Sequence, residues 1–302
     1  MRLAGDPAMR VMLATDDSAS ARTAEDWVRR VHYAAAPTID VVCVAGRGRT
    51  GFGWGLQTYR EAVRVAVEGL RQGELYAAER IANEVGERLQ SDGLAVRTWA
   101  RQGDCCEELL AMAEVDRPDL VVVGPRGRSG LAAVILGSVT QGLIAHAASP
   151  LLVARPPLTQ AGRLPEHVLL VVDGTHTAET TVAWLARAGW LAGGRATVLG
   201  LLGERAGLEH EEPEAADEMA RLVRSDAIAT LEQLVQPLAD NDVSLDYVLR
   251  SGHPLQATFD ATEELKIDLV AVARPKRRPG RNPIAEKIAR HSTASVLLVP
   301  PA

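Results

Sequence analysis

The sequence predicts an α/β protein of two tandem domains, each a doubly wound parallel sheet of five strands with helices on both faces. Short apolar segments alternate with longer segments of helical periodicity along all 302 residues. This alternation is typical of parallel strands that are joined by helices. The same order of segments occurs twice, and the length suits two domains of ordinary size.

Strands are expected where short apolar runs are bounded by turn residues. In the first half these runs lie near residues 10–15, 39–44, 94–101, 119–124 and 150–154. In the second half they lie near 167–172, 196–201, 243–250, 267–272 and 295–299. Helices are expected in the intervals, for example over 138–147, where apolar residues recur at helical spacing.

The two halves of the chain match each other segment by segment. Each opens on an apolar strand that ends in an aspartate, Asp16 or Asp173, and a tryptophan follows 11 residues later in both. Asp-Leu-Val also begins the fourth apolar run of each half. This repeat predicts a first domain over 1–155, a linker with prolines over 156–163 and a second domain over 164–302.

Composition and charge exclude several classes of protein. A formal net charge of -6 argues against non-specific binding to nucleic acid or to membrane surfaces. The sequence contains no run of about 18 apolar residues, so a membrane span is not expected. Three cysteines, Cys43, Cys105 and Cys106, are too few for a disulfide framework, and we expect ordinary thiols and a cytoplasmic protein.

The most informative segment follows the strand near 119–124. It reads Gly124-Pro125-Arg126-Gly127, then nine residues, then Gly137-Ser138 at the start of a predicted helix. Such a loop offers backbone N–H groups and the positive end of a helix to one anion, and glycines permit its close approach. Ligands of doubly wound sheets bind at the carboxyl ends of the strands, where Asp16, Val44 and Gly124 would meet. The pattern therefore predicts a site for a phosphorylated ligand such as a nucleotide.

Spacing and flanking segments together resemble a known family. Gly124-x-x-Gly127, nine residues and Gly137-Ser138 are similar to the nucleotide-binding motif of the universal stress protein family. The opening strand with Asp16 and Ser18 is similar too, as is Ser149-Pro150-Leu151-Leu152-Val153. The resemblance covers nearly the whole chain and implies two Rossmann-like domains of the adenine nucleotide alpha hydrolase type.

The resemblance implies one ATP site, in the first domain, built from three groups of residues. Those expected at the adenine and ribose are Asp16 and the backbone of Val44. Those expected along the ribose and phosphate path are Val123 and Gly124. Those expected to give the phosphates backbone N–H groups, together with the Ser138 hydroxyl, are Gly127, Gly137, Ser138 and Val139.

Other features of this site rest on the loop itself. Arg126 and Arg128 lie within it and would add positive charge. Mg²⁺ could accompany the nucleotide, held mainly by phosphates and water. Asp16 could instead cap the helix that follows it, a role that is compatible with ligand binding. A backbone cradle recognises phosphate more than base, so ADP, AMP and cyclic nucleotides stay open beside ATP.

The second half lacks this loop. Ala273 stands in place of Gly124, Ile284 in place of Ser138, and prolines 275, 279 and 283 remove backbone donors. We therefore expect no nucleotide site of this kind there. Five basic residues between 274 and 281 leave three interpretations open: an anion site made by side chains, a contact with an acidic partner, or a solvated loop.

The chemistry that the sequence lacks favours binding over turnover. It contains no Gly-Lys-Ser/Thr phosphate loop, no Gly-x-Ser-x-Gly elbow and no evident base to activate water. We expect a stress-response regulator that binds ATP and is read by a protein partner. Two alternatives are a slow ATP hydrolase or nucleotidyl transferase on the same fold, and a scaffold without a ligand. The resemblance further implies that the two domains pair as a pseudo-dimer through 150–154 and 295–299, and that two chains form a homodimer.

Overall fold

The computed structural model describes residues 8–46, 61–127, 136–157, 162–172, 177–202, 213–274 and 284–301. Its contacts divide the chain into two compact units. The first comprises residues 1–29 and 35–154, and the second comprises residues 30–34 and 155–302.

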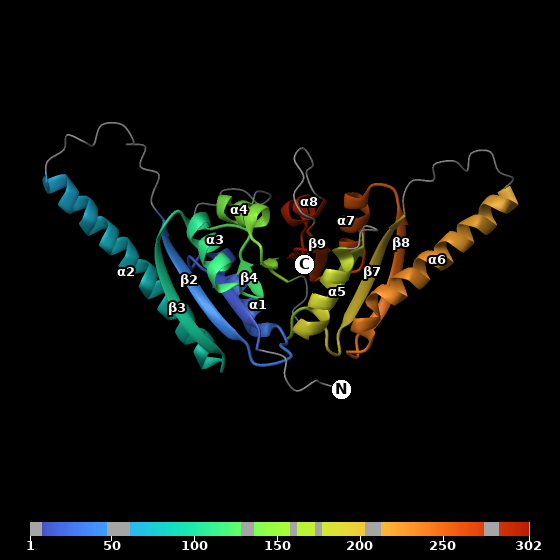
Figure 1. Ribbon diagram of the computed structural model, residues 1–302, viewed down its shortest axis with the longest axis horizontal. Helices are drawn as coiled ribbons and strands as arrows, with labels where there is room; N and C mark the ends of the chain where they lie inside the picture. Colours follow the sequence, from blue (N-terminus) through green and yellow to red (C-terminus); the bar gives the residue numbers. More distant parts are fainter. Residues whose placement is uncertain are drawn as a thin grey trace. The chain divides into compact units, whose positions relative to one another are not determined.

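The first unit is a parallel sheet with helices. Its strands are β1 (Arg10–Ala14), β2 (Thr38–Gly46), β3 (Ala95–Gly103), β4 (Leu120–Val123) and β5 (Leu151–Val153). Its helices are α1 (Ala19–Arg30), α2 (Glu61–Ser91), α3 (Cys105–Asp116) and α4 (Ser138–His146). Neighbouring strands follow the order β3-β2-β1-β4-β5, and every pair is parallel. In Figure 1, α2 runs along β2 and β3, which it contacts.

The second unit repeats this arrangement. Its strands are β6 (His167–Val172), β7 (Arg195–Leu202), β8 (Ser244–Ser251), β9 (Leu269–Ala273) and β10 (Ser295–Val299). Its helices are α5 (Thr177–Ala188), α6 (Pro213–Ala239), α7 (Pro254–Glu264) and α8 (Ile284–His291). Its neighbouring strands follow the order β8-β7-β6-β9-β10, which matches the order of the first sheet strand for strand, again with parallel pairs. The predicted fold class, tandem and doubly wound, is confirmed.

Fully buried strands form a large part of the core. β6, β9 and β10 are buried along their whole length, as is expected of parallel strands covered on both faces. Aromatic residues are few, but two tryptophans of the second unit, Trp184 and Trp190, pack edge to face with ring centroids 4.9 Å apart. Aliphatic side chains therefore make most of each core, as the composition suggests.

The repeated Asp-Leu-Val segment has a structural reason. Asp119 lies just before β4 and accepts a hydrogen bond from the backbone N–H of Arg10, at 2.9 Å, where β1 begins. Asp268 lies just before β9 and accepts from the N–H groups of Glu166 and His167, each at 3.2 Å, where β6 begins. Both aspartates tie the amino ends of two neighbouring strands together. They stand at the edge of the sheet opposite the predicted ligand site.

Candidate functional site

The turn after β1 presents the first predicted ligand residue. Asp16 Oδ1 accepts a hydrogen bond from the Ser18 N–H at 3.0 Å, and Thr15 Oγ1 accepts from the Asp17 N–H at 3.2 Å. Asp17 has a φ of 58°, in the left-handed region that aspartate tolerates better than most residues. These local bonds give the turn one defined shape and leave Asp16 at the carboxyl end of β1.

The helix after this turn is capped by a different residue from the one that we considered. Ser18 Oγ accepts from the Ala21 N–H at 3.2 Å, and the Ser18 carbonyl accepts from the Arg22 N–H at 2.9 Å. Ser18 is therefore the N-cap of α1. The suggestion that Asp16 caps this helix is wrong, because the left-handed Asp17 turns the chain before the helix begins.

Two loop glycines lie close to this turn. A methyl group on Gly127 would stand 2.6 Å from Oδ2 of Asp16, which places the Asp16 carboxylate directly against the loop. A methyl group on Gly124 would stand 2.5 Å from the backbone oxygen of Ser20 in α1. Gly124 is thus required by the packing of α1. Both glycines lie beside the segment that follows β1, Gly127 against Asp16 and Gly124 against Ser20.

The far end of the loop is closed by its own hydrogen bonds. The Gly137 N–H donates to the Pro125 carbonyl at 2.8 Å, so it serves the loop here rather than facing a phosphate. Thr140 is buried in α4 and its hydroxyl donates to the Gly124 carbonyl at 2.9 Å. Sequence reasoning missed Thr140, although a hydroxyl in the first turn of a helix that packs on a strand end is a usable signal.

The start of α4 has the properties of an anion site. Gly137 precedes the helix with an extended backbone and provides no side-chain cap, and no acidic residue stands in the first turn. The N–H groups of Ser138 and Val139 belong to that turn, where amides have no acceptor within the helix. Ser138 is exposed and Val139 is half-buried. The positive end of the α4 dipole is therefore not compensated by an acidic side chain of its own first turn.

The base end of the predicted site contains a residue that we did not assign to it. The Cys105 thiol, at the start of α3, lies 3.8 Å from the Val44 carbonyl oxygen in β2. Burial, followed by the negative charges of Asp104 and Asp16, raises the pKa of the Cys105 thiol. Cys105 therefore lies near both Val44 and Asp16. The signal was its place at a helix start beyond the carboxyl end of a strand.

Of the remaining predicted residues, the structure describes some and not others. Val123 is buried at the end of β4, and its carbonyl accepts from the Ala154 N–H at 2.8 Å, so its role is structural as well. Arg126 is half-buried in the loop and Gly127 is exposed. Arg128, Asp173 and the basic residues from 276 to 281 lie outside the described residues.

In the second unit the equivalent place holds a buried cation. Arg274 follows β9 and is 8% exposed, and its backbone N–H donates to the Val299 carbonyl at 2.7 Å. Burial lowers the pKa of Arg274, and the negative charge of Glu286 opposes this shift. Glu286 stands in the first turn of α8, the helix that corresponds to α4. This helix start therefore carries its own negative charge.

Two properties of the described residues bear on other functions. No group of three or more histidine, cysteine, aspartate or glutamate side chains in the described part of the chain is arranged to hold a metal ion. None of the helices described combines the length and the apolar character that a membrane crossing requires.

Comparisons with known proteins agree on one family. The model of the universal stress protein family matches residues 8–155 and again 165–300. A universal stress protein of Methanocaldococcus jannaschii is 35% identical over 65 residues, which cover 22% of this chain and 38% of that protein. One of Mycolicibacterium smegmatis is 28% identical over 181 residues, 57% of each chain. The chain thus spans less than two thirds of the length of these curated relatives.

A solved structure shows the same fold. The crystal structure of a universal stress protein from Archaeoglobus fulgidus matches with a TM-score of 0.66 at 15% sequence identity. The match covers 96% of this chain and 98% of that chain.

Proposed function

The chain belongs to the universal stress protein family, and we propose that its first domain binds one adenine nucleotide, ATP by preference, and acts through binding rather than turnover. In this proposal the protein is a cytoplasmic regulator of a stress response. Binding would change the shape of the loop between β4 and α4, and a protein partner would recognise that change. The pairing of the two domains and of two chains remains a prediction of the family resemblance.

One observation carries the proposal. The Asp16 carboxylate from the end of β1 lies against Gly127 of the β4–α4 loop, beside a helix start without a side-chain cap or an acidic first turn. A carboxylate suits ribose hydroxyl groups as an acceptor, and helix-terminal amides suit phosphate. The two kinds of group stand at the switch point between β1 and β4, where doubly wound sheets bind ligands.

The arrangement assigns a role to each part of the nucleotide. Val44 and Cys105 would border the base, Asp16 would accept from the ribose, and the Ser138 and Val139 amides would bind phosphate. Arg126 would add positive charge to the same loop. We expect Mg²⁺, when present, to be held mainly by phosphates and water.

Calorimetry with ATP and the full chain tests the proposal. We expect saturable binding of one ATP per chain. Gly127→Val should weaken it at least about tenfold, because the added Cβ would stand 2.6 Å from the Asp16 carboxylate and displace it. Gly73→Val is the matched control, since a methyl group there meets nothing within 4 Å. Equal affinity in all three proteins, or no binding at millimolar ATP, would refute the proposed site.

Product formation separates binding from catalysis. The purified chain incubated with ATP and Mg²⁺ should release ADP and phosphate far more slowly than about one per second, the lower end of the usual range for enzymes. Faster release would establish the hydrolase or transferase alternative instead.

A further inference from the structure

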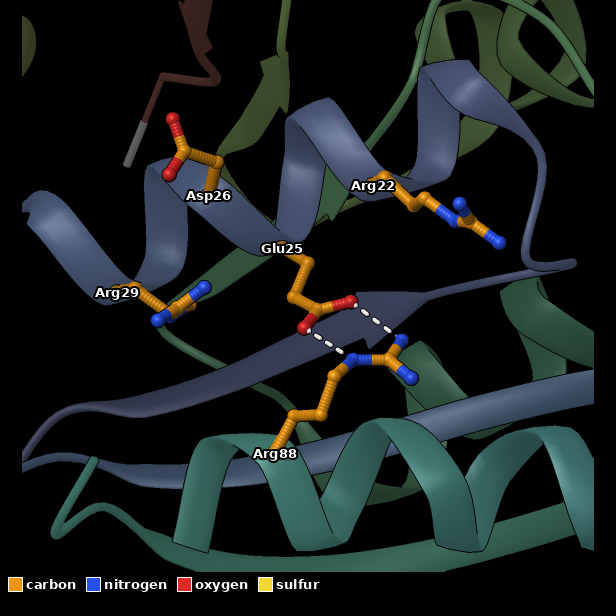
Figure 2. A pocket seen from close by; sticks show the side chains of 5 residues that line it. All are labelled: Arg22, Glu25, Asp26, Arg29 and Arg88. Atoms are coloured by element: carbon orange, nitrogen blue, oxygen red, sulfur yellow. Dashed lines mark hydrogen bonds and ion pairs between the residues drawn. The ribbon is translucent and has the colours of Figure 1, made fainter. Parts of the chain in front are cut away.

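An open pocket of about 380 Å³ that is lined by charged residues lies between α1 and α2 (Figure 2). It is lined by Arg22, Glu25, Asp26 and Arg29 of α1 and by Arg88 of α2. Figure 2 shows Glu25 and Arg88 pointing toward each other across it, with Arg22 nearer the start of α1. Nothing in the predicted nucleotide motif accounts for these charges.

Glu25 and Arg88 form a bidentate ion pair, in which two guanidinium nitrogens of Arg88 donate to the two carboxylate oxygens of Glu25. Arg88 Nε donates to Oε1 of Glu25 and Nη2 donates to Oε2, each at 2.8 Å. Glu25 is 6% exposed although it is charged. The hydrogen bonds that Arg88 donates to Glu25, and then the negative charges of Glu25 and Asp17, raise the pKa of Arg88 against the opposing effect of burial. Two parallel bonds to a buried carboxylate hold the Arg88 guanidinium in one place and orientation.

The same guanidinium reaches the turn that carries Asp16. Arg88 Nη2 lies 3.7 Å from Oδ1 of Asp17. Arg22 also pairs with the Asp17 carboxylate, at 3.1 Å, but its side chain is 66% exposed. Because Asp17 holds a left-handed backbone conformation between Asp16 and the cap of α1, a cation fixed on α2 restrains the turn.

We propose that Arg88 is a positioning residue of the nucleotide site, which acts through Asp17 on the turn that presents Asp16 and ties that turn to α2. This inference rests on the proposed function. Glu25 fixes the cation, the cation restrains Asp17, and the restrained turn keeps the Asp16 carboxylate at Gly127. Linkage requires the reverse as well, so ATP should strengthen the contact between the turn and α2.

Two sets of variants isolate this path. Asp17→Asn keeps a residue that tolerates the left-handed conformation but removes the charge that faces Arg88. It also removes the charge that accepts two hydrogen bonds from Arg22, so Arg22→Gln is measured beside it and should leave the affinity for ATP unchanged. Glu25→Gln together with Arg88→Gln removes the pair without leaving a buried carboxylate uncompensated, which Arg88→Gln alone would do. Arg80→Gln is the matched control, because Arg80 lies on the same helix and pairs with Glu84 at an exposed position.

The test is the affinity for ATP by calorimetry, with the melting temperature measured alongside. Asp17→Asn and the Glu25/Arg88 double variant should each weaken binding about fivefold, within the usual range of coupling between sites, and Arg80→Gln should not. Combining all three substitutions should add no further loss, because both act through one contact. If these residues had only a structural role, the substitutions would lower the melting temperature, and the triple variant would lose more affinity for ATP than either set of substitutions alone.

Three outcomes would overturn the inference. Unchanged affinity in Asp17→Asn and in the double variant would refute the coupling while leaving the proposed function intact. Losses that add in the triple variant would show that Arg88 does not act through Asp17. A failure of the unaltered chain to bind ATP would refute the proposed function first, and the positioning role with it.

Discussion

The two units share a sheet and differ at its carboxyl edge. In the first, Gly124 admits the α1 backbone, Gly127 admits the Asp16 carboxylate, and α4 begins without an acidic residue. In the second, Ala273 fills the place of Gly124, Arg274 is buried beside it, and α8 begins with Glu286 in its first turn. The strand order is the same in both. The second unit therefore has the same strand order without the glycine loop. In the first unit the packing of α1 accounts for Gly124, and the proposed ligand would account for the rest of the loop.

The opposite edge of the sheet shows a second difference. In the first unit Asp40 is buried in β2 and accepts two hydrogen bonds of 2.7 Å from Arg97 and one of 3.0 Å from Trp99. At the same register position of the second sheet stands Thr197, which bonds to His167 at 2.8 Å. Arg195 in turn donates to His167. One unit thus satisfies its buried polar group with an ion pair, and the other with a neutral imidazole.

The largest expected effect comes from giving the end of β4 the residue type that stands at the end of β9. Gly124→Ala should cost about 1–3 kcal/mol of unfolding free energy, because its methyl group would stand 2.5 Å from the Ser20 backbone oxygen, which cannot rotate away. The displaced loop should also weaken ATP binding about tenfold or more. Urea denaturation and calorimetry measure the two effects.

The reciprocal change is the matched control. Ala273→Gly removes one buried methyl group and should cost about 1–2 kcal/mol, from lost burial and added backbone freedom. It should leave the affinity for ATP unchanged. If the two substitutions weaken ATP binding equally, the distinction between a binding unit and a non-binding unit is wrong.

The next largest expected effect is a dependence of the unfolding free energy on pH that arises at His167. Burial, and after it the positive charge of Arg195, lowers the pKa of His167 below its ordinary value. Above about pH 6.5 the imidazole is neutral in both folded and unfolded chains, and it adds no pH dependence. Between about pH 6.5 and the lower pKa of His167 in the folded chain, the imidazole is protonated in the unfolded chain and neutral in the folded one. The free energy of unfolding therefore falls as the pH falls through this range, and it falls no further below the folded pKa.

Thermal denaturation of the full chain from pH 8 to pH 5 measures this loss. One proton limits its slope to about 1.4 kcal/mol per pH unit. His167→Gln should flatten the profile, because glutamine can still exchange hydrogen bonds with Thr197 and Arg195 without taking a proton. His253→Gln, at the exposed start of α7, is the matched control for exchanging a histidine for glutamine. A profile of the His167 variant that matches the unaltered chain would contradict the account.

Sequence reasoning located the elements because their signals are local. The apolar runs of the strands end within one or two residues of the observed ends, as for β7, which was expected over 196–201 and covers Arg195–Leu202. Gly137 likewise marked the start of α4 at Ser138. Hydrophobic periodicity and turn chemistry are properties of neighbouring residues, so one chain is enough to reveal them.

The parts that were missed depend on contacts between distant residues. Thr140 bonds to Gly124 across 16 residues, and Cys105 lies against Val44 across 61. Such pairings appear only when the topology brings the strand ends together. The left-handed Asp17, which moves the cap of α1 from Asp16 to Ser18, was missed for another reason, because several residues of this turn can each serve as a cap.

The smallest expected effect uses the thiols, which occur only in the first half of the chain. Cys105 begins α3 beside Val44, whereas Pro254 begins α7 at the corresponding place, so a thiol reagent reports on one unit alone. ATP bound at Asp16 and Val44 would cover the Cys105 thiol. Its alkylation by iodoacetamide, already slow because burial raises its pKa, should slow by a further factor of about three.

Mass spectrometry of peptides that cover residues 105 and 106 measures the rate, with Cys105→Ala and Cys106→Ala variants to assign the label. Cys106 is the internal control, because it is the next residue of α3 and its sulfur lies against Gly142 of α4, whereas the Cys105 thiol lies 3.8 Å from the Val44 carbonyl oxygen.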